Sequence, residues 1–340
     1  MIKNPFCFIY LIVWLVIISC NRHKEVKNIY ISGFDVIKDN PNSSEQVEAK
    51  YWKNGNCVIM GEARVASLHT TVSILQNGED NYFSIELLND SSRGVAAFWK
   101  NGKKQLLTDG ADSSAVTSMA VSGSNIYAAG FKQQGEKSTA IYWKNGVSVF
   151  LLKNATSSTA KAIAIGDNND IYIAGSSTDK KNISLAMYWK NGIPVVLTKN
   201  QDAAATCLAL DRSDIYVGGC IYTKKGEIAV YWKNGIAVLL SSGNNRAFIS
   251  GIAAQSGNVY ICGYESIKGV LVAKYWKNGN YFPLSDGTKV AAAIDIAVNG
   301  SDVYVVGFEG MYARLWKNGY PTDLSNGDRQ NVASRIYLEK

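Results

Sequence analysis

A four-residue phrase, Trp-Lys-Asn-Gly, occurs seven times in this 340-residue chain. Its tryptophans are Trp52, Trp99, Trp143, Trp189, Trp232, Trp276 and Trp316. Successive spacings counted along the sequence are 47, 44, 46, 43, 44 and 40 residues. A self-similar period of this length is typical of solenoids, propellers and repeat arrays. The chain is therefore expected to fold as repeated units of one supersecondary structure.

The residues around each copy predict two β-hairpins per period. The Asn-Gly pair lies between two β-prone runs, as in Ala186 to Tyr188 before Trp189 and Val195 to Leu197 after it. Asn-Gly favours a type I′ turn because both central residues need positive φ. A second hairpin fits between copies, for example Ala162–Ile165 followed by Ile171–Gly175. We letter the four strands A to D, and four strands in about 45 residues indicate a propeller blade.

The number of blades follows from counting these strands. The B strands carry one tyrosine each: Tyr30, Tyr82, Tyr127, Tyr172, Tyr216, Tyr260 and Tyr304. The chain begins with a B strand at 28–33 that has no A strand before it, and ends with an A-like strand at 333–338. We predict an all-β, seven-bladed β-propeller over 28–340, closed by antiparallel pairing of the C-terminal strand with the N-terminal strand.

Blade two, about Ala66 to Leu107, departs from the other blades. Its A–B turn, Asn77 to Asn81, is longer, and Ile85 occupies a position where other B strands have glycine. Blade seven has a short B–C loop, which explains the shortest spacing. The sequence therefore predicts one irregular blade in an otherwise regular ring.

The first residues have the pattern of an export signal. Lys3 precedes an apolar run from Phe6 to Ile18, which is shorter than the ~20 residues that span a bilayer. The segment Ile17-Ile18-Ser19-Cys20 resembles a bacterial lipobox. This resemblance implies a signal peptide at 1–19, lipidation of Cys20, a short polar tether at 20–27 and a lipid-anchored place in the bacterial envelope. The alternative is an ordinary signal with an incidental cysteine.

The repeated tryptophans and lysines have structural and functional interpretations. Seven tryptophans spread around a ring cannot converge on one ligand, so we expect them to pack between neighbouring blades. The seven lysines after them equal the formal net charge of +7 in number and are expected at one rim. They either protect sheet edges or attract anionic lipid or acidic glycan. Export and the lack of a nucleic-acid motif argue against a nucleic-acid partner.

The sequence offers no constellation for catalysis, metal or cofactor binding. Beyond Cys20 the cysteines are Cys57, Cys207, Cys220 and Cys262, and their spacing does not suggest a metal site. Cys262 is expected to be a small buried residue, whereas a Cys207–Cys220 disulfide stays open. With only two histidines, a His-based triad is not expected. We predict no catalytic residues, no metal and no cofactor.

The ligand site is expected at the mouth of the central funnel, formed by D–A and B–C loops. Candidates are loop residues that break the repeat: Glu62, Arg64, His69, Asp202, Asn244, Asn245, Arg246, Lys289, Asp328 and Arg329. The favoured function is a scaffold that binds a protein or glycan. One alternative is a hydrolase or lyase acting on a glycan, with Glu62, Asp202 or Asp328 as acid or base. Another is a purely architectural envelope component.

From residue 28 onward, the repeat resembles those of bacterial seven-bladed propeller lipoproteins. It differs from kelch repeats, which have a Gly-Gly pair in every blade, and from the Trp-Asp class. The resemblance implies the fold and the envelope location, and implies no activity.

Overall fold

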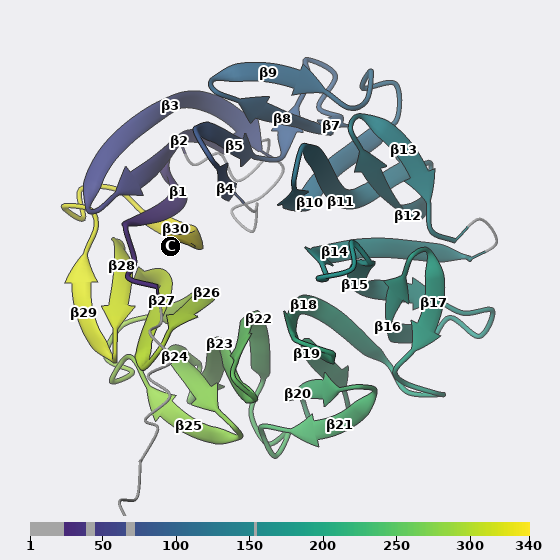
Figure 1. The fold of residues 1–340 in the computed structure, drawn as a ribbon. Helices are drawn as coiled ribbons and strands as arrows, with labels where there is room; N and C mark the ends of the chain where they lie inside the picture. The colour runs from purple at the N-terminus through teal and green to yellow at the C-terminus, as the bar shows by residue number, and fades with distance from the viewer. Residues whose placement is uncertain (1–23, 39–44, 66–71, 153–154) are drawn as a thin grey trace, which may run out of the picture.

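The computed structural model describes residues 24–38, 45–65, 72–152 and 155–340. In these ranges every regular element is a strand, and no helix is long and apolar enough to cross a membrane. The strands form seven four-stranded antiparallel sheets arranged in a ring, with the A strands innermost (Figure 1). The predicted seven-bladed β-propeller is confirmed.

The strands of each blade run in the order A to D from the channel outward. Blade one contains β30 (Asn331–Glu339), β1 (Asn28–Lys38), β2 (Glu45–Lys53) and β3 (Asn56–Val65). Blade two contains β4 (Ser73–Asn77), β5 (Asp80–Ser84), β8 (Ala97–Lys100) and β9 (Lys103–Leu106). Blade three contains β10 (Ser113–Ser122), β11 (Asn125–Gln134), β12 (Lys137–Lys144) and β13 (Val147–Phe150). Blade four contains β14 (Ser157–Ile165), β15 (Ile171–Thr178), β16 (Ser184–Lys190) and β17 (Ile193–Val196).

The other three blades follow the same pattern. Blade five contains β18 (Ala203–Asp211), β19 (Asp214–Tyr222), β20 (Glu227–Lys233) and β21 (Ile236–Leu239). Blade six contains β22 (Ala247–Gln255), β23 (Asn258–Ile267), β24 (Val270–Lys277) and β25 (Asn280–Pro283). Blade seven contains β26 (Ala291–Asn299), β27 (Asp302–Glu309), β28 (Tyr312–Lys317) and β29 (Tyr320–Asp323). A short extra hairpin, β6 (Leu87–Leu88) and β7 (Gly94–Val95), lies in the B–C connection of blade two.

Strand β30 closes the ring by pairing with β1. The pairing is antiparallel, with Tyr30 opposite Tyr337, and confirms the predicted closure. The described end of the tether also contacts the propeller. The backbone N–H of Lys27 donates to the carbonyl of Glu339 at 2.8 Å, and the side-chain amide of Asn299 donates to the carbonyl of Lys24 at 2.9 Å. The chain is therefore already held against blades one and seven from residue 24 onward.

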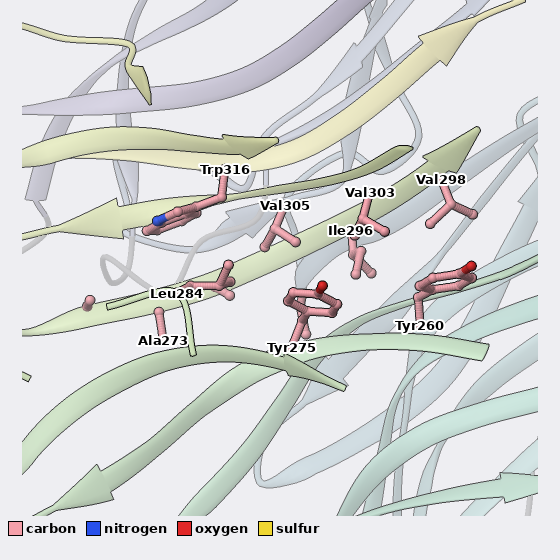
Figure 2. Close-up of a cluster of buried hydrophobic side chains, with 12 residues drawn as sticks. Tyr260, Ala273, Tyr275, Leu284, Ile296, Val298, Val303, Val305 and Trp316 are labelled. Carbon is pink, nitrogen blue, oxygen red and sulfur yellow. The ribbon is translucent and has the colours of Figure 1, made fainter. Parts of the chain in front are cut away.

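The repeated tryptophans pack each blade against the preceding one, as expected. Trp189 of blade four is fully buried in a cluster that includes Tyr127 and Ala129 of blade three. Trp316 of blade seven lies over Ala273 of blade six in the same way (Figure 2). Trp99 of blade two is the exception, because its side chain is only partly buried.

The rest of the phrase joins the C–D hairpin to the start of the B strand. In all seven copies the asparagine has φ between 50° and 52° and the glycine between 76° and 89°, as a type I′ turn requires. In blade four the side chain of Asn191 accepts the N–H of Ile171 at 2.8 Å and donates to Asp170 at 2.7 Å. Its backbone N–H also donates to the carbonyl of Ile171 at 2.8 Å.

The repeated lysine completes this clamp. Lys190 Nζ lies 3.0 Å from a carboxylate oxygen of Asp170 and 5.3 Å from the ring centre of Tyr172. Hydrogen bonds from Asn191 and Lys190 lower the pKa of Asp170. A lysine–tyrosine contact occurs in all seven blades. The A–B aspartates Asp170, Asp214 and Asp302 therefore bind the C–D hairpin of their own blade.

A β-bulge interrupts the A strand of blades one and three to seven. In blade three, consecutive residues Ala129 and Gly130 of the B strand face Ser118 and Val116, so Thr117 is the extra residue. The facing glycine is needed because a Cβ on Gly130 would lie 1.9 Å from the carbonyl oxygen of Ala115. The other bulged blades have glycines in the same relation: Gly33, Gly175, Gly219, Gly263 and Gly307.

Blade two has Ile85 where this glycine would stand, as the sequence indicates. Its A–B ladder ends at the pair Ser73–Ser84, just before the position of the bulge. An isoleucine side chain does not allow the close carbonyl approach that the other blades use. The B–C connection of blade two also forms the extra hairpin β6–β7, so the predicted irregularity of this blade is confirmed. Its A–B turn has two residues, Gly78 and Glu79, between the paired residues Asn77 and Asp80, and is as short as that of blade three, so the expectation of a longer turn is wrong.

Replacing Trp189 by alanine tests the packing between blades. We expect Trp189→Ala to lower the free energy of unfolding by about 3–5 kcal/mol, as truncation of a large buried aromatic does. Urea denaturation followed by tryptophan fluorescence and circular dichroism measures this change. Trp99→Ala is the control and should have a clearly smaller effect because Trp99 is partly exposed. Equal effects of the two variants would contradict the account.

Candidate binding site in the central channel

The bulges direct one residue from each of six A strands into the central channel. These residues are Thr117, Lys161, Thr206, Ser250, Ile294 and Ser334. All six line a single cavity of about 490 Å³. This volume lies within the range of about 300–1,000 Å³ found for small-molecule sites. The fold thus places a ring of side chains of different chemistry around one cavity.

The cavity lies at the end of the channel that the D–A and B–C loops surround. Its wall includes Phe248 near the start of β22, Tyr264 near the end of β23 and Gln330 just before β30. The Asn-Gly turns and A–B turns lie at the other end of the blades. The structure therefore puts the cavity at the funnel mouth that the sequence analysis favoured.

One side of the cavity is apolar and comes from blades six, seven and one. The rings of Phe248 and Tyr264 stack with centroids 5.7 Å apart and planes 20° apart. Leu271, Phe308 and Val332 continue this wall. Burial raises the pKa of Tyr264, so its hydroxyl stays protonated. The apolar wall faces the hydroxyl-bearing and charged residues of the opposite blades.

The threonines at the bulges fix neighbouring A strands to one another. The Thr117 hydroxyl lies 2.9 Å from the carbonyl oxygen of Ala160 in blade four and 3.0 Å from that of Ala129. The Thr206 hydroxyl lies 2.8 Å from the carbonyl oxygen of Ile249 in blade six. A hydroxyl has one hydrogen to donate, and these carbonyls take it. Toward the cavity, both threonine oxygens are therefore hydrogen-bond acceptors.

Lys161 carries the unpaired charge of the site. Its side chain is open to the cavity, and within the described part of the chain it makes no ion pair or hydrogen bond. Desolvation by the surrounding strands lowers the pKa of Lys161, while the charge of Glu86 acts in the opposite direction. An amine without a counterion in such a place favours an anionic ligand.

The second cation, Arg335, faces a carboxylate below the cavity. Arg335 Nη1 lies 4.0 Å from Asp295 Oδ1, and Asp295 Oδ2 accepts the backbone N–H of Ile336 at 3.0 Å. Burial raises the pKa of Asp295, and Arg335 opposes that shift. Arg335 is therefore largely compensated from within the protein.

Cys207 and Cys262 lie near Asp295 and Arg335, and all three buried cysteines are free thiols. Burial raises the pKa of Cys207 to about 12 and that of Cys262 well above its usual value, so both thiols are protonated. Cys262 is fully buried, as predicted. Cys207 faces Gly218 and Cys220 faces Ala204, so the register does not bring Cys207 and Cys220 together, and both are free thiols.

The described candidates named from the sequence do not line the cavity. In blade five, the side chain of Asp202 accepts the backbone N–H of Ser184 at 2.8 Å. In blade six, Arg246 pairs with Glu227 at 2.9 Å. The partners of the next candidates are similarly local: Asn244 to Ser242, Asn245 to Glu265 and Lys289 to Tyr312.

The remaining candidates belong to blade one and to the loop before it. Asp328 bonds Asn326, and the carbonyl of Arg329 accepts from Asn331 at 2.7 Å. Glu62 accepts from Gln46 at 2.7 Å and lines a smaller hollow of about 160 Å³ between blades one and two. Arg64 contacts Ser92 at 3.3 Å. His69 and Cys20 lie outside the described residues. The described acid or base candidates, Glu62, Asp202 and Asp328, do not converge in the cavity.

The sequence analysis missed the two charged residues of the channel. Lys161 stands in the run Ala160-Lys161-Ala162-Ile163-Ala164, a charged residue in an otherwise small and apolar innermost strand. Arg335 interrupts the last strand in the same way. A charged residue within an apolar inner strand was a signal present in the sequence. The candidates were chosen from the loops alone, so Lys161 and Arg335 were not among them.

No family model matches this chain, and no curated protein matches it. Solved structures resemble its fold. The β-propeller domain of the Trilobed protease from Pyrococcus furiosus is 11% identical, with a TM-score of 0.57 over 90% of this chain and 98% of that one. A puromycin-hydrolyzing peptidase of Mycobacterium tuberculosis is 9% identical, with a TM-score of 0.56 over 86% of this chain.

The chain spans 53% of the length of the mycobacterial peptidase. The Hadza microbial sialidase Hz136 is 7% identical, with a TM-score of 0.51 over 87% of this chain and 73% of that one. At such identities the likeness shows the propeller fold alone.

Replacing Lys161 by methionine tests whether the positive charge of Lys161 destabilises the folded protein. Folding disfavours protonated Lys161, so near neutral pH we expect Lys161→Met to raise the melting temperature. This advantage should shrink as the pH rises toward the ordinary lysine pKa of 10.5, because the unfolded lysine then also loses its proton. Differential scanning calorimetry at several pH values measures both effects. A clear loss of stability near neutral pH would contradict the assignment.

Proposed function

We propose that this protein is a lipid-anchored binding module of the bacterial envelope that holds part of its ligand in the central cavity. The observation that carries the proposal is the cavity of about 490 Å³ with one bulged residue from each of six blades around it. The ligand is a protein or a glycan. The hydroxyls of Thr117, Thr206 and Ser250 and the apolar wall opposite them favour a glycan, which has both hydroxyls and apolar ring faces.

The path of the chain sets the orientation of the module in this proposal. Lys24 is bonded to Asn299 in an A–B turn of blade seven, so residues 21–23 alone separate it from Cys20. The four residue steps from Cys20 to Lys24 span at most about 14 Å. A lipid on Cys20 would therefore bring the face with the A–B and C–D turns close to the membrane. The cavity, at the opposite end of the channel, would open away from the membrane toward a ligand.

The hydrolase alternative rests on the kind of proteins that share the fold. Structures of similar fold are described as a peptidase, a protease domain and a sialidase. For this chain the alternative would require a reactive pair at the cavity, and the described wall offers hydroxyls, Lys161 and Arg335. Products of a bound oligosaccharide, detected by mass spectrometry, would favour this alternative. A purely architectural role would leave the cavity without a ligand.

Filling the cavity tests the proposed site. We expect Ser250→Trp to abolish binding of the full chain to an array of soluble neutral and acidic oligosaccharides, because the indole would occupy the cavity. Ser148→Trp, on the exposed outer strand β13, is the matched control and should bind as the unaltered chain does. Circular dichroism melts establish that both variants are folded. Equal binding by both variants would place the ligand elsewhere.

Replacing Cys20 tests the anchor. With Cys20→Ser, we expect metabolic labelling with an alkyne fatty acid to be lost and the protein to leave the membrane fraction, because the thiol that receives the lipid is gone. Labelling and fractionation of cells that express either form measure this. Cys57→Ser is the control, because Cys57 lies on the outer strand β3. Unchanged labelling of Cys20→Ser would contradict lipidation at this residue.

A further inference from the structure

We propose that the ligand group in the cavity is an acidic sugar of the hexuronate kind, whose carboxylate pairs with Lys161. This inference rests on the proposed function, since it takes the central cavity as the binding site. It goes further by assigning the charge of the ligand and the residues that recognise it.

The positive charge of Lys161 in the cavity wall favours a ligand with one negative charge. Among the described residues that line the cavity, the charged ones are Lys161 and Arg335. Arg335 already faces Asp295, whereas Lys161 is attracted by Glu86 only through space and forms no ion pair in the described part of the chain. A carboxylate at Lys161 would supply the missing counterion in a site where desolvation strengthens the attraction.

The hydroxyl oxygens of the cavity wall favour a ligand that also carries hydrogen-bond donors, in addition to its carboxylate. Thr117 and Thr206 each give their hydrogen to a backbone carbonyl, so their oxygens face the cavity as acceptors. Ser334 is 2% exposed, and its buried hydroxyl oxygen is not accessible to a ligand in the cavity. The ligand therefore needs hydroxyl donors that reach the oxygens of Thr117 and Thr206.

A hexuronate meets both requirements in one small molecule. It carries a carboxylate, hydroxyls that donate, and C–H ring faces that can pack on the wall of Phe248, Tyr264 and Leu271. A simple fatty acid lacks the donors. A free amino acid has donors and a carboxylate but carries no net charge to match Lys161. A peptide with a free C-terminal carboxylate is the competing class and is separated by experiment.

Paired sugars that differ only in the carboxylate test the inference. Isothermal titration calorimetry of the full chain would use a β-1,4-linked disaccharide of glucuronate and its neutral analogue cellobiose. We expect the uronate to bind and cellobiose to bind much more weakly. Lys161→Met should weaken the uronate about 10- to 100-fold, the usual effect of losing a hydrogen bond to a charged group. Lys180→Met, in a B–C loop outside the cavity wall, should leave the affinity unchanged.

The other outcomes separate this inference from the proposed function. If both disaccharides bind equally and Lys161→Met changes neither, the carboxylate assignment is wrong while a glycan site in the channel stands. If neither disaccharide binds but the peptide Gly-Gly-Phe binds and depends on Lys161, the ligand is a peptide carboxylate and the sugar assignment is overturned. If none of the three binds, both the inference and the proposed channel site are contradicted.

Discussion

The close approach of each A strand to a glycine of its B strand is the contact on which the channel depends. In six blades the A-strand carbonyl occupies the space that a Cβ would need. The resulting bulge adds one residue to the A strand, and the side chain of this residue points toward the channel axis. In a regular strand, successive side chains would instead alternate between the two faces of the sheet. The repeated glycine contact, which is a packing feature, therefore places a ring of residues of different types around the channel. The six glycines are the same in kind, whereas the residues that they allow to point inward differ in size, charge and polarity.

Structure and recognition are separated between the two ends of the propeller. At one end the repeated lysine, asparagine and glycine join each C–D hairpin to its B strand, and the tryptophans pack each blade on the one before it. Their chemistry is the same in every blade because their task is the same. At the other end lies a cavity whose wall has no repeat, with Lys161 in blade four and a stacked aromatic pair in blade six. Binding is therefore expected at the residues that depart from the repeat.

The sequence predicted the fold well because each repeated residue has a local task. Asn-Gly turns, B-strand tyrosines and unmatched terminal strands were sufficient for the blade number and for ring closure by β30. The irregular blade followed from Ile85. The site was not predicted at the level of residues, because which A-strand residue faces the axis depends on the bulge. A bulge shifts the alternation by one residue and is set by pairing with the next strand, so Lys161 could not be placed on the channel side in advance.

The central claim is that the channel, with Lys161 in its wall, holds an acidic sugar. The most direct measurement is a crystal structure of the full chain grown with the β-1,4-linked glucuronate disaccharide. The account predicts electron density for a sugar ring in the cavity, with a carboxylate oxygen within hydrogen-bond distance of Lys161 Nζ and a sugar hydroxyl at Thr117 or Thr206. Density for the disaccharide at the Asn-Gly face or in the hollow beside Glu62, with the channel free of sugar, would contradict it.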